Sequence, residues 1–396
     1  MNTDLNTQEI INLDAAYVLG TYPRAPIVFE SGQGMWLFDS AGRRYLDFTS
    51  GIAVNALGHA APEIVQAVET QIHKLMHVSN LYYTRPQAEL ARDLCQKSFA
   101  ERVFFCNSGA EAVEAAIKFA RKSGRQAGGE QKTRLVAFSG GFHGRTMGAL
   151  ALTAREKYQA PFRPLMPNVD IVPFNDLQAA KQVIGPQTCG VIVEPIQGEG
   201  GLQVADEKFL AGLRELCDRH NARLIFDEIQ CGLGRTGKLW AYEHSGVIPD
   251  MMTLAKALGG GLPMGAVLLN GHCAEVIAPG DHGSTFAAGP VAASSAQVVL
   301  DRVSSAAMLA HVNQVAGYLA ERLAALQSPH IQEIRGRGLM IGIRLDRDVQ
   351  PLLEAGYQQG ILLLNAGPDV LRLLPALILT KEHVDLLVEF LTGAQL

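Results

Sequence analysis

Apolar and polar positions along this chain follow two periods. Apolar residues spaced three and four apart predict helices over residues 7–20, 62–75 and 87–96. After residue 100, short continuous apolar runs, which are typical of buried strands, occur at 102–106, 135–138, 188–194, 222–226 and 251–255. Helical patterns separate these runs, so the region from 102 to 270 is predicted to form a mostly parallel sheet with helices on both faces.

The two ends of the chain have a different pattern. Residues 36–39 and 44–48 predict a hairpin. From about 306, a long helix to about 326, strands at 331–335, 339–343, 361–364 and 370–374, and a closing helix predict an α+β region. Because 396 residues exceed what one core usually supports, we expect two domains. The predicted boundaries give an N-terminal segment (1–60) that packs with a small C-terminal domain (306–396), and a large domain (61–305) between them.

Two reactive side chains follow predicted strands. Asp227 ends the run 222–226, and Lys256 follows the run 251–255 just before Gly259-Gly-Gly261. In an open α/β sheet, ligands bind at this edge. A lysine amine can form an imine with an aldehyde cofactor, and a buried carboxylate can keep a pyridine nitrogen protonated. Taken alone, however, an Asp and a Lys are more often a helix cap and a surface charge.

Other segments carry suitable but less specific chemistry. The helix that follows strand 102–106 begins with Ser108-Gly-Ala110, and its free N–H groups can bind phosphate, although a plain capped helix is an equal alternative. Phe142 can cover a planar ring and Arg145 can bind an anion, or they can be core and surface residues. Arg372 lies in an apolar strand, where burial is unfavourable unless an anion meets it.

One segment matches nucleotide motifs. Gly232-Leu-Gly-Arg-Thr-Gly-Lys238 satisfies both G-x-G-x-x-G and G-x-x-x-x-G-K. Leu239 occupies the Ser/Thr position of a P-loop, and residues 228–231 separate the loop from its strand. Both departures argue against a nucleotide site.

Composition narrows the class. The chain is 48% hydrophobic and 18% charged, with net charge −5, and no run of Lys or Arg suggests nucleic acid or a membrane surface. It has no basic start followed by an apolar run, and its six cysteines form no C-x-x-C pair, so we expect a cytoplasmic protein. His73 and His77 have the spacing of metal ligands, but without a third ligand no metal is expected.

Several ordered motifs resemble those of the class III pyridoxal phosphate aminotransferases, and the resemblance covers nearly the whole chain. They are Leu224-Ile-Phe-Asp-Glu-Ile-Gln230, Gly234-Arg-Thr-Gly237, Leu254-Ala-Lys-Ala-Leu-Gly-Gly-Gly261 and Pro263-Met-Gly-Ala266. The resemblance implies the α/β fold of fold type I transferases, with a large domain built on a mostly parallel seven-stranded sheet and a small α+β domain.

The resemblance also assigns site residues. It implies that Lys256 binds the pyridoxal phosphate aldehyde and is the general base, and that Asp227 holds the ring nitrogen. The cofactor neighbours that it implies are Ser108, Gly109 and Ala110 at the phosphate, Phe142 on the ring, Gln230 at the ring hydroxyl, and Thr285, which reaches the phosphate of the other subunit in a homodimer. The implied substrate residues are Arg145, Ser284, Arg372 and Glu194, the last expected to neutralise an arginine while the amino donor is bound.

Three further blocks are most similar to the acetylornithine and succinylornithine aminotransferases: residues 50–59, 79–84 and 106–111. The expected reaction moves the δ-amino group of N2-acetyl-L-ornithine to 2-oxoglutarate, a step of arginine biosynthesis. Gly51 stands where ornithine-specific relatives tend to have an aromatic residue, which leaves room for an acyl group. Succinylornithine, ornithine or another ω-amine as donor, an aminomutase or racemase, and a non-enzymatic protein remain alternatives. Val113 and Gly289 depart from the family pattern.

Overall fold

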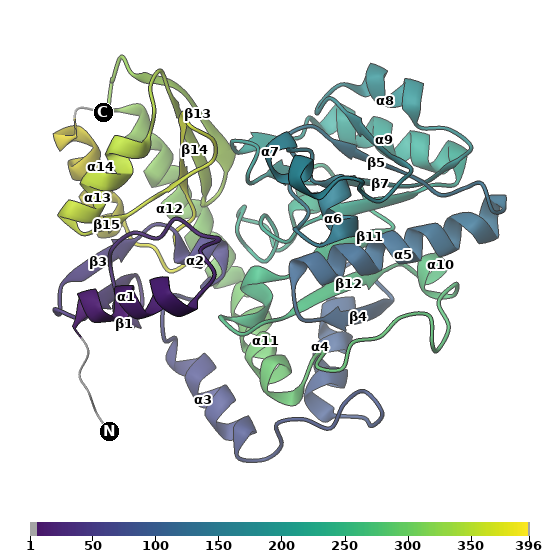
Figure 1. Cartoon of the computed structure of the whole chain (residues 1–396), viewed down its shortest axis with the longest axis horizontal. Coiled ribbons are helices and arrows are strands. Elements are labelled where there is room, and N and C mark those ends of the chain that lie inside the picture. The colour runs from purple at the N-terminus through teal and green to yellow at the C-terminus, as the bar shows by residue number, and fades with distance from the viewer. Residues whose placement is uncertain (1–5, 395–396) are drawn as a thin grey trace.

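The computed structural model describes residues 6–394 and divides into two parts that lie side by side (Figure 1). The larger part contains a seven-stranded sheet in the order β4-β12-β11-β10-β7-β5-β6. Its strands are β4 (Arg102–Cys106), β5 (Arg134–Phe138), β6 (Val169–Val172), β7 (Thr188–Val193), β10 (Arg223–Asp227), β11 (Met251–Leu254) and β12 (Gly265–Leu269). Only β12 runs antiparallel to its neighbours, β11 and β4. The mostly parallel seven-stranded sheet predicted from the sequence is therefore confirmed.

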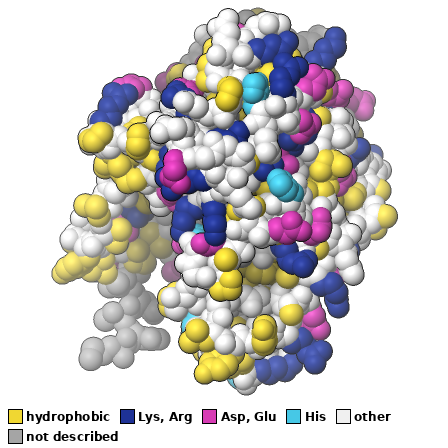
Figure 2. Space-filling view, turned by 90° about the vertical axis from the view of Figure 1, so that its right-hand side faces the viewer, with side chains coloured by type: hydrophobic (Ala, Val, Ile, Leu, Met, Phe, Trp, Pro, Cys, Tyr) yellow, Lys and Arg dark blue, Asp and Glu magenta, His cyan; other side chains and the backbone are white. Residues whose placement is uncertain are grey.

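Helices cover both faces of this sheet, which explains why its strands are continuous apolar runs. All five residues of β10 are buried. Ile225 packs into the cluster formed with α5 (Gly109–Gly128), while Leu224 and Phe226 pack into the opposite cluster with α9 (Glu207–His220). Val113, one of the two departures from the family pattern, is fully buried in α5. The outer surface of this part carries charges of both signs interspersed (Figure 2).

The remaining elements of the larger part connect and cover these strands. They are α3 (Pro62–Ile72), α4 (Arg85–Gln96), α6 (Met147–Leu152), α7 (Glu156–Gln159), η1 (Ala160–Phe162), α8 (Leu177–Val183), β8 (Ile196–Gln197), β9 (Gln203–Val204), η2 (Ala241–His244), η3 (Lys256–Gly259), α10 (Gly271–Ala274) and α11 (Pro290–Val303). Gly289, the second departure, immediately precedes α11. The helix predicted over 62–75 ends at Ile72, and the helix predicted to start near Ser108 is α5, which runs to Gly128.

The smaller part joins both ends of the chain. One sheet has the order β1-β2-β3-β15, and the other has the order β13-β14-β17-β16. The strands are β1 (Phe29–Gln33), β2 (Trp36–Asp39), β3 (Arg44–Asp47), β13 (Ile331–Arg337), β14 (Met340–Leu345), β15 (Ile361–Leu362), β16 (Leu364–Asn365) and β17 (Val370–Leu373). The helices are α1 (Thr7–Tyr17), α2 (Ser50–Ala53), α12 (Ala306–Ala324), α13 (Gln350–Gln359) and α14 (Lys381–Gly393).

The run 361–364, predicted as one strand, is divided between these two sheets. Residues Ile361 and Leu362 pair in parallel with β3, whereas Leu364 pairs with β17. The single-strand prediction was wrong because the chain changes sheets at Leu363. The domain boundaries near residues 60 and 305 stay a prediction, and residues 1–5 and 395–396 of the predicted segments lie outside the described residues.

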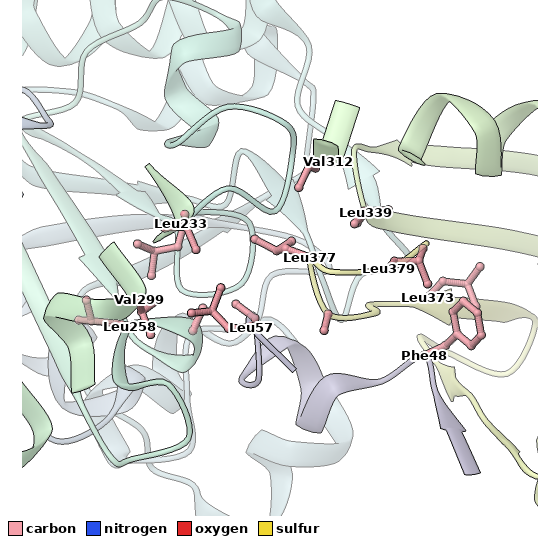
Figure 3. Close-up of a cluster of buried hydrophobic side chains, with 14 of the residues drawn as sticks. Phe48, Leu57, Leu233, Leu258, Val299, Val312, Leu339, Leu373, Leu377 and Leu379 are labelled. Atoms are coloured by element: carbon pink, nitrogen blue, oxygen red, sulfur yellow. The ribbon is translucent and has the colours of Figure 1, made fainter. Parts of the chain in front are cut away.

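A continuous row of buried side chains joins the two parts (Figure 3). Leu258 and Val299 lie at its end in the larger part, and Leu373 and Phe48 at its end in the smaller part. Burial of this apolar surface stabilises the contact between the parts. The cavity described below lies on the large sheet, beside that contact.

Candidate active site

The ends of the central strands and the start of α5 enclose a cavity of about 460 Å³. Its wall contains nine of the residues predicted for the site: Ser108, Gly109, Ala110, Phe142, Arg145, Glu194, Asp227, Gln230 and Lys256. Other residues on the wall are Val54, Asn107, His143, Glu199, Ile229 and Met264. The strands converge here because the parallel strands β10 and β11 end at the same edge of the sheet.

Asp227 ends β10 as the centre of a buried hydrogen-bond network. Its Oδ2 lies 2.7 Å from Nδ1 of His143, and its Oδ1 accepts from Oγ1 of Thr253 at 3.0 Å and from N–H of Ile229 at 3.1 Å. Burial by itself lowers the pKa of His143, but the hydrogen bond and charge of Asp227 outweigh it, so the pKa is raised. The network fixes the carboxylate in one orientation, which suits it to hold a protonated ring nitrogen.

Lys256 follows β11 with its backbone in the left-handed region, at φ +44°. Such a conformation is strained for a residue with a side chain and is typical of functional positions. Burial, followed by the positive charge of Arg372, lowers the pKa of Lys256 to about 8. A substantial fraction of the amine is therefore neutral near pH 8, and only the neutral amine is a nucleophile or a base.

The first turn of α5 forms a cradle of small residues on the cavity wall. Oγ of Ser108 caps the helix by accepting from N–H of Glu111 at 3.2 Å. A Cβ added to Gly109 would lie 3.0 Å from Cδ1 of Ile229, so the backbone there is closely packed. The free N–H groups and the macrodipole of a 20-residue helix favour an anion such as phosphate at this end.

Within residues 6–394, Glu194 forms no ion pair with an arginine, so its predicted role as an arginine's partner stays a prediction. Its Oε1 accepts from N–H of Phe142 at 2.9 Å, and its Oε2 accepts from N–H of Gly198 at 3.1 Å. Burial raises the pKa of Glu194 to about 7. Glu194 therefore orders the backbone of the loop that carries Phe142.

The acid that pairs with the buried arginine is Glu199. Nη1 of Arg372 lies 2.7 Å from Oε1 of Glu199 and 3.5 Å from Oε1 of Gln230. Burial opposes ionisation of Glu199, but the charge of Arg372 outweighs it and lowers the pKa of that carboxyl. Sequence reasoning missed Glu199 because two acids five residues apart give no sign of which one faces a strand from the smaller part.

Arg145 lies at the exposed rim of the cavity. Its guanidinium stands over the rings of Phe142 and Tyr158, 5.6 and 3.5 Å from their centroids. Tyr158 is a second residue that sequence reasoning missed, since a single aromatic residue in a four-residue helix carries no pattern.

Within residues 6–394, four candidate residues do not line the cavity: Arg372, which lies behind Glu199, and Ser284, Thr285 and Gly51. Oγ of Ser284 accepts from Nδ2 of Asn107, a wall residue, at 2.8 Å, so Ser284 lies one contact away. Thr285 is exposed, and its contact with a second subunit stays a prediction. Gly51 is exposed in a turn with φ +64°, while its neighbour Val54 faces the cavity.

The segment with nucleotide motifs is packed against the smaller part. All of its residues except Lys238 are buried. Arg235 donates to the carbonyl oxygen atoms of Leu339, at 3.2 Å, and Pro375. Burial lowers the pKa of Arg235 to about 9. The segment 232–238 is therefore packed into the protein and offers no open loop for a nucleotide phosphate.

Comparison with known families identifies the chain. A family model described as Aminotransferase class-III matches residues 20–394. The chain belongs to the class-III aminotransferases. It is an enzyme of the fold type I architecture, with its lysine and aspartate at the ends of adjacent strands.

Individual relatives give a finer comparison. The aminotransferase is 48% identical over 392 residues to the mitochondrial acetylornithine aminotransferase of Alnus glutinosa, covering 97% of this chain and 87% of that protein. It is 44% identical over 389 residues to the acetylornithine aminotransferase of Methanocaldococcus jannaschii, covering 98% of both.

Among solved structures, the N-acetylornithine aminotransferase of Stenotrophomonas maltophilia has a TM-score of 0.84 at 40% identity, covering 97% of this chain and 98% of that one. The ornithine aminotransferase of Toxoplasma gondii has a TM-score of 0.94 at 29% identity, covering 98% and 96%. Backbone similarity therefore does not separate the two donors.

Residues 6–394 contain no group of three His, Cys, Asp or Glu side chains arranged to hold a metal ion. Within the same residues, no helix has the length and apolar character needed to cross a membrane.

Proposed function

We propose that this enzyme transfers the δ-amino group of N2-acetyl-L-ornithine to 2-oxoglutarate with pyridoxal phosphate as cofactor. The products are N-acetyl-L-glutamate 5-semialdehyde and L-glutamate, which places the reaction in arginine biosynthesis. The observation that carries the proposal is the meeting of Lys256, Asp227 and Arg145 on one cavity wall, with Arg372 directly behind it, paired with the wall residue Glu199. The acetylornithine aminotransferases at 43–48% identity support this choice of donor.

The cavity fits the cofactor in each chemical respect. Lys256 offers an amine for the aldehyde, Asp227 offers a carboxyl oxygen for the ring nitrogen, and the first turn of α5 offers N–H groups for the phosphate. Phe142 supplies an apolar face for the ring and Gln230 a polar neighbour for its hydroxyl. When bound, the cofactor supplies an electron-withdrawing ring that accepts the electron pair of a broken C–H bond.

The protein supplies the proton transfer. With a pKa of about 8, Nζ of Lys256 can accept a proton from the substrate carbon that bears the amine and release it later. His143 and Thr253 hold Asp227 so that its negative charge stays at the ring nitrogen.

The two arginines explain how one cavity serves two substrates. N-acetylornithine has one carboxylate, which Arg145 can bind at the rim while Arg372 stays paired with Glu199. 2-Oxoglutarate has two carboxylates, and the second can displace Glu199 and pair with Arg372. The ion pair therefore lets the site take a substrate with or without a second negative charge.

We also propose a homodimer. Large apolar side chains are strongly exposed on residues 81–83 and at Phe286: Leu81 by 84%, Tyr82 by 70% and Phe286 by 69%. Nδ2 of Asn80 donates to the carbonyl oxygen of Ser284 at 3.0 Å, so these segments form one surface. Contact with a second copy would cover this surface and bring Thr285, next to Phe286, to the neighbouring site.

The six cysteines are free thiols, which supports a cytoplasmic location.

A donor panel tests the function. The purified enzyme with pyridoxal phosphate should use N-acetylornithine with a kcat/KM at least about tenfold above that for ornithine. Equal values would contradict the proposed donor, and a higher value for succinylornithine would point to that alternative. Borohydride treatment should attach the cofactor to the peptide that contains Lys256. Repeated turnover without 2-oxoglutarate would indicate an aminomutase instead, because an aminotransferase without a keto acid stops after one product per active site.

A further inference from the structure

Arg145 has unusual contacts for a cation at a binding cavity. Within residues 6–394, its guanidinium makes no hydrogen bond and no ion pair, and it touches two aromatic rings. The nearer ring is that of Tyr158, 3.5 Å from the guanidinium carbon to the ring centroid, which is stacking distance.

Tyr158 is itself held in place. Its ring meets that of Phe142 edge-on, at 6.4 Å and 85°. The next residue, Gln159, donates through Nε2 to the carbonyl oxygens of Thr153 at 2.9 Å and Leu150 at 3.1 Å. These bonds anchor α7 to α6 and to the residue that follows α6, so the ring offers Arg145 a fixed face.

Stacking on an aromatic ring, unlike an ion pair, leaves the N–H donors of a guanidinium free. A carboxylate partner occupies N–H donors of a guanidinium, whereas an aromatic face contacts only its π surface. The five N–H groups in the plane stay available for a substrate carboxylate. The stack also limits the rotamers of an exposed, flexible side chain, so less entropy is lost when the carboxylate binds.

We propose that Tyr158 is a positioning residue that holds Arg145 ready to bind the carboxylate of both the amino donor and the keto acid. This inference rests on the proposed function, because that function gives Arg145 a carboxylate to bind. Lys157 offers a matched control, since its ammonium stands 4.9 Å from the centroid of the same ring but is absent from the cavity wall.

Calorimetric titration with glutarate, an unreactive five-carbon dicarboxylate, tests the inference without turnover. The cofactor-loaded enzyme should bind glutarate about three- to tenfold more weakly after Tyr158→Leu. Tyr158→Phe, which keeps the ring, and Lys157→Met should each stay within about twofold of the wild type. Tyr158→Met gives a second side chain without a ring if the leucine variant folds poorly. Unchanged binding in the ring-free variants, or equal weakening in Tyr158→Phe, would overturn the inference.

A pair of donors separates positioning from a general structural effect. N-acetylornithine carries the carboxylate, and N-acetyl-1,4-diaminobutane is the same molecule without it. Tyr158→Leu should raise KM for N-acetylornithine by about three- to tenfold with little change in kcat, and should leave kcat/KM for the second donor within about twofold. Equal losses for both donors would show that the ring only supports the fold. If the wild type uses neither donor, the proposed function fails, and the glutarate titration still decides the role of Tyr158.

Discussion

The two arginines at the cavity, Arg145 on its wall and Arg372 behind Glu199, hold positive charge in opposite ways. Arg372 is buried and paired with Glu199 at 2.7 Å, whereas Arg145 is exposed and stacked on Tyr158. A buried guanidinium requires a counter-charge because desolvation is otherwise unfavourable by several kcal/mol, while an exposed one stays hydrated. The buried end, which also contains Asp227, is therefore preorganised and sensitive to change. The rim around Arg145 should tolerate substitutions without loss of stability, and substitutions there should affect mainly the binding of substrate.

The largest effect is expected at the buried end, from Asp227→Asn. This change keeps the shape of the side chain but removes the charge proposed to stabilise the protonated ring. We expect kcat to fall by about 10³-fold. Steady-state kinetics would measure it, with the exposed Asp206→Asn as control. A loss smaller than about tenfold would show that the charge of Asp227 is dispensable.

A pH profile tests the same end through Lys256. Its pKa is lowered to about 8, so in the enzyme stripped of cofactor the amine loses its proton as the pH rises through 8. The rate at which added pyridoxal phosphate forms its covalent link should rise about tenfold per pH unit below 8 and level off above it. Absorbance after rapid mixing would follow this rate. A midpoint near 10.5, the ordinary value for lysine, would contradict the lowered pKa.

Glu199→Gln should leave Arg372, like Arg145, without a carboxylate partner. Without the carboxylate, Arg372 is left buried with an uncompensated charge and can attract the single carboxylate of the donor into the wrong pose. The donor half-reaction should slow about tenfold, while the glutamate half-reaction stays within about threefold. Single-turnover absorbance would separate the two half-reactions. Glu207→Gln, an exposed acid in α9, is the control, and equal slowing of both half-reactions would refute a selective role.

The smallest effect is expected near the rim, at Gly51. Its φ of +64° is unfavourable for other residues, and a Cβ there would lie 3.3 Å from Nδ2 of Asn55 and 3.7 Å from Cβ of Val54. Gly51→Ala should therefore reduce the free energy of unfolding by about 1 kcal/mol through backbone strain. Thermal unfolding would measure this loss. Gly51→Tyr carries the same strain and, by the family resemblance, should shift preference towards ornithine. An unchanged ratio of donor kcat/KM values would refute that shift.

The sequence predicted the features that depend on residues close together in the chain. Continuous apolar runs predicted the strands of the large sheet, and Asp227 and Lys256 stood out because each follows such a run. The family resemblance then selected nine residues that share the cavity wall.

The sequence did not predict contacts between distant segments. Whether Glu194 or Glu199 meets Arg372 depends on how β17 of the smaller part faces the loop after β7 of the larger part. The stacking of Arg145 on Tyr158 depends on the placement of a four-residue helix, which has no periodic pattern. Such contacts follow from tertiary packing and are not marked by any local sequence pattern.

The parallel pairing of β3 with β15 also has a consequence for folding during synthesis, because β15 is translated long after β3. The first strands leave the ribosome early, but their neighbour at Ile361 is translated only near the end. At ordinary elongation rates this delay lasts on the order of tens of seconds, during which the edge of β3 has no native neighbour. A chaperone that shields nascent strands should therefore raise the yield of this enzyme most when translation is slow.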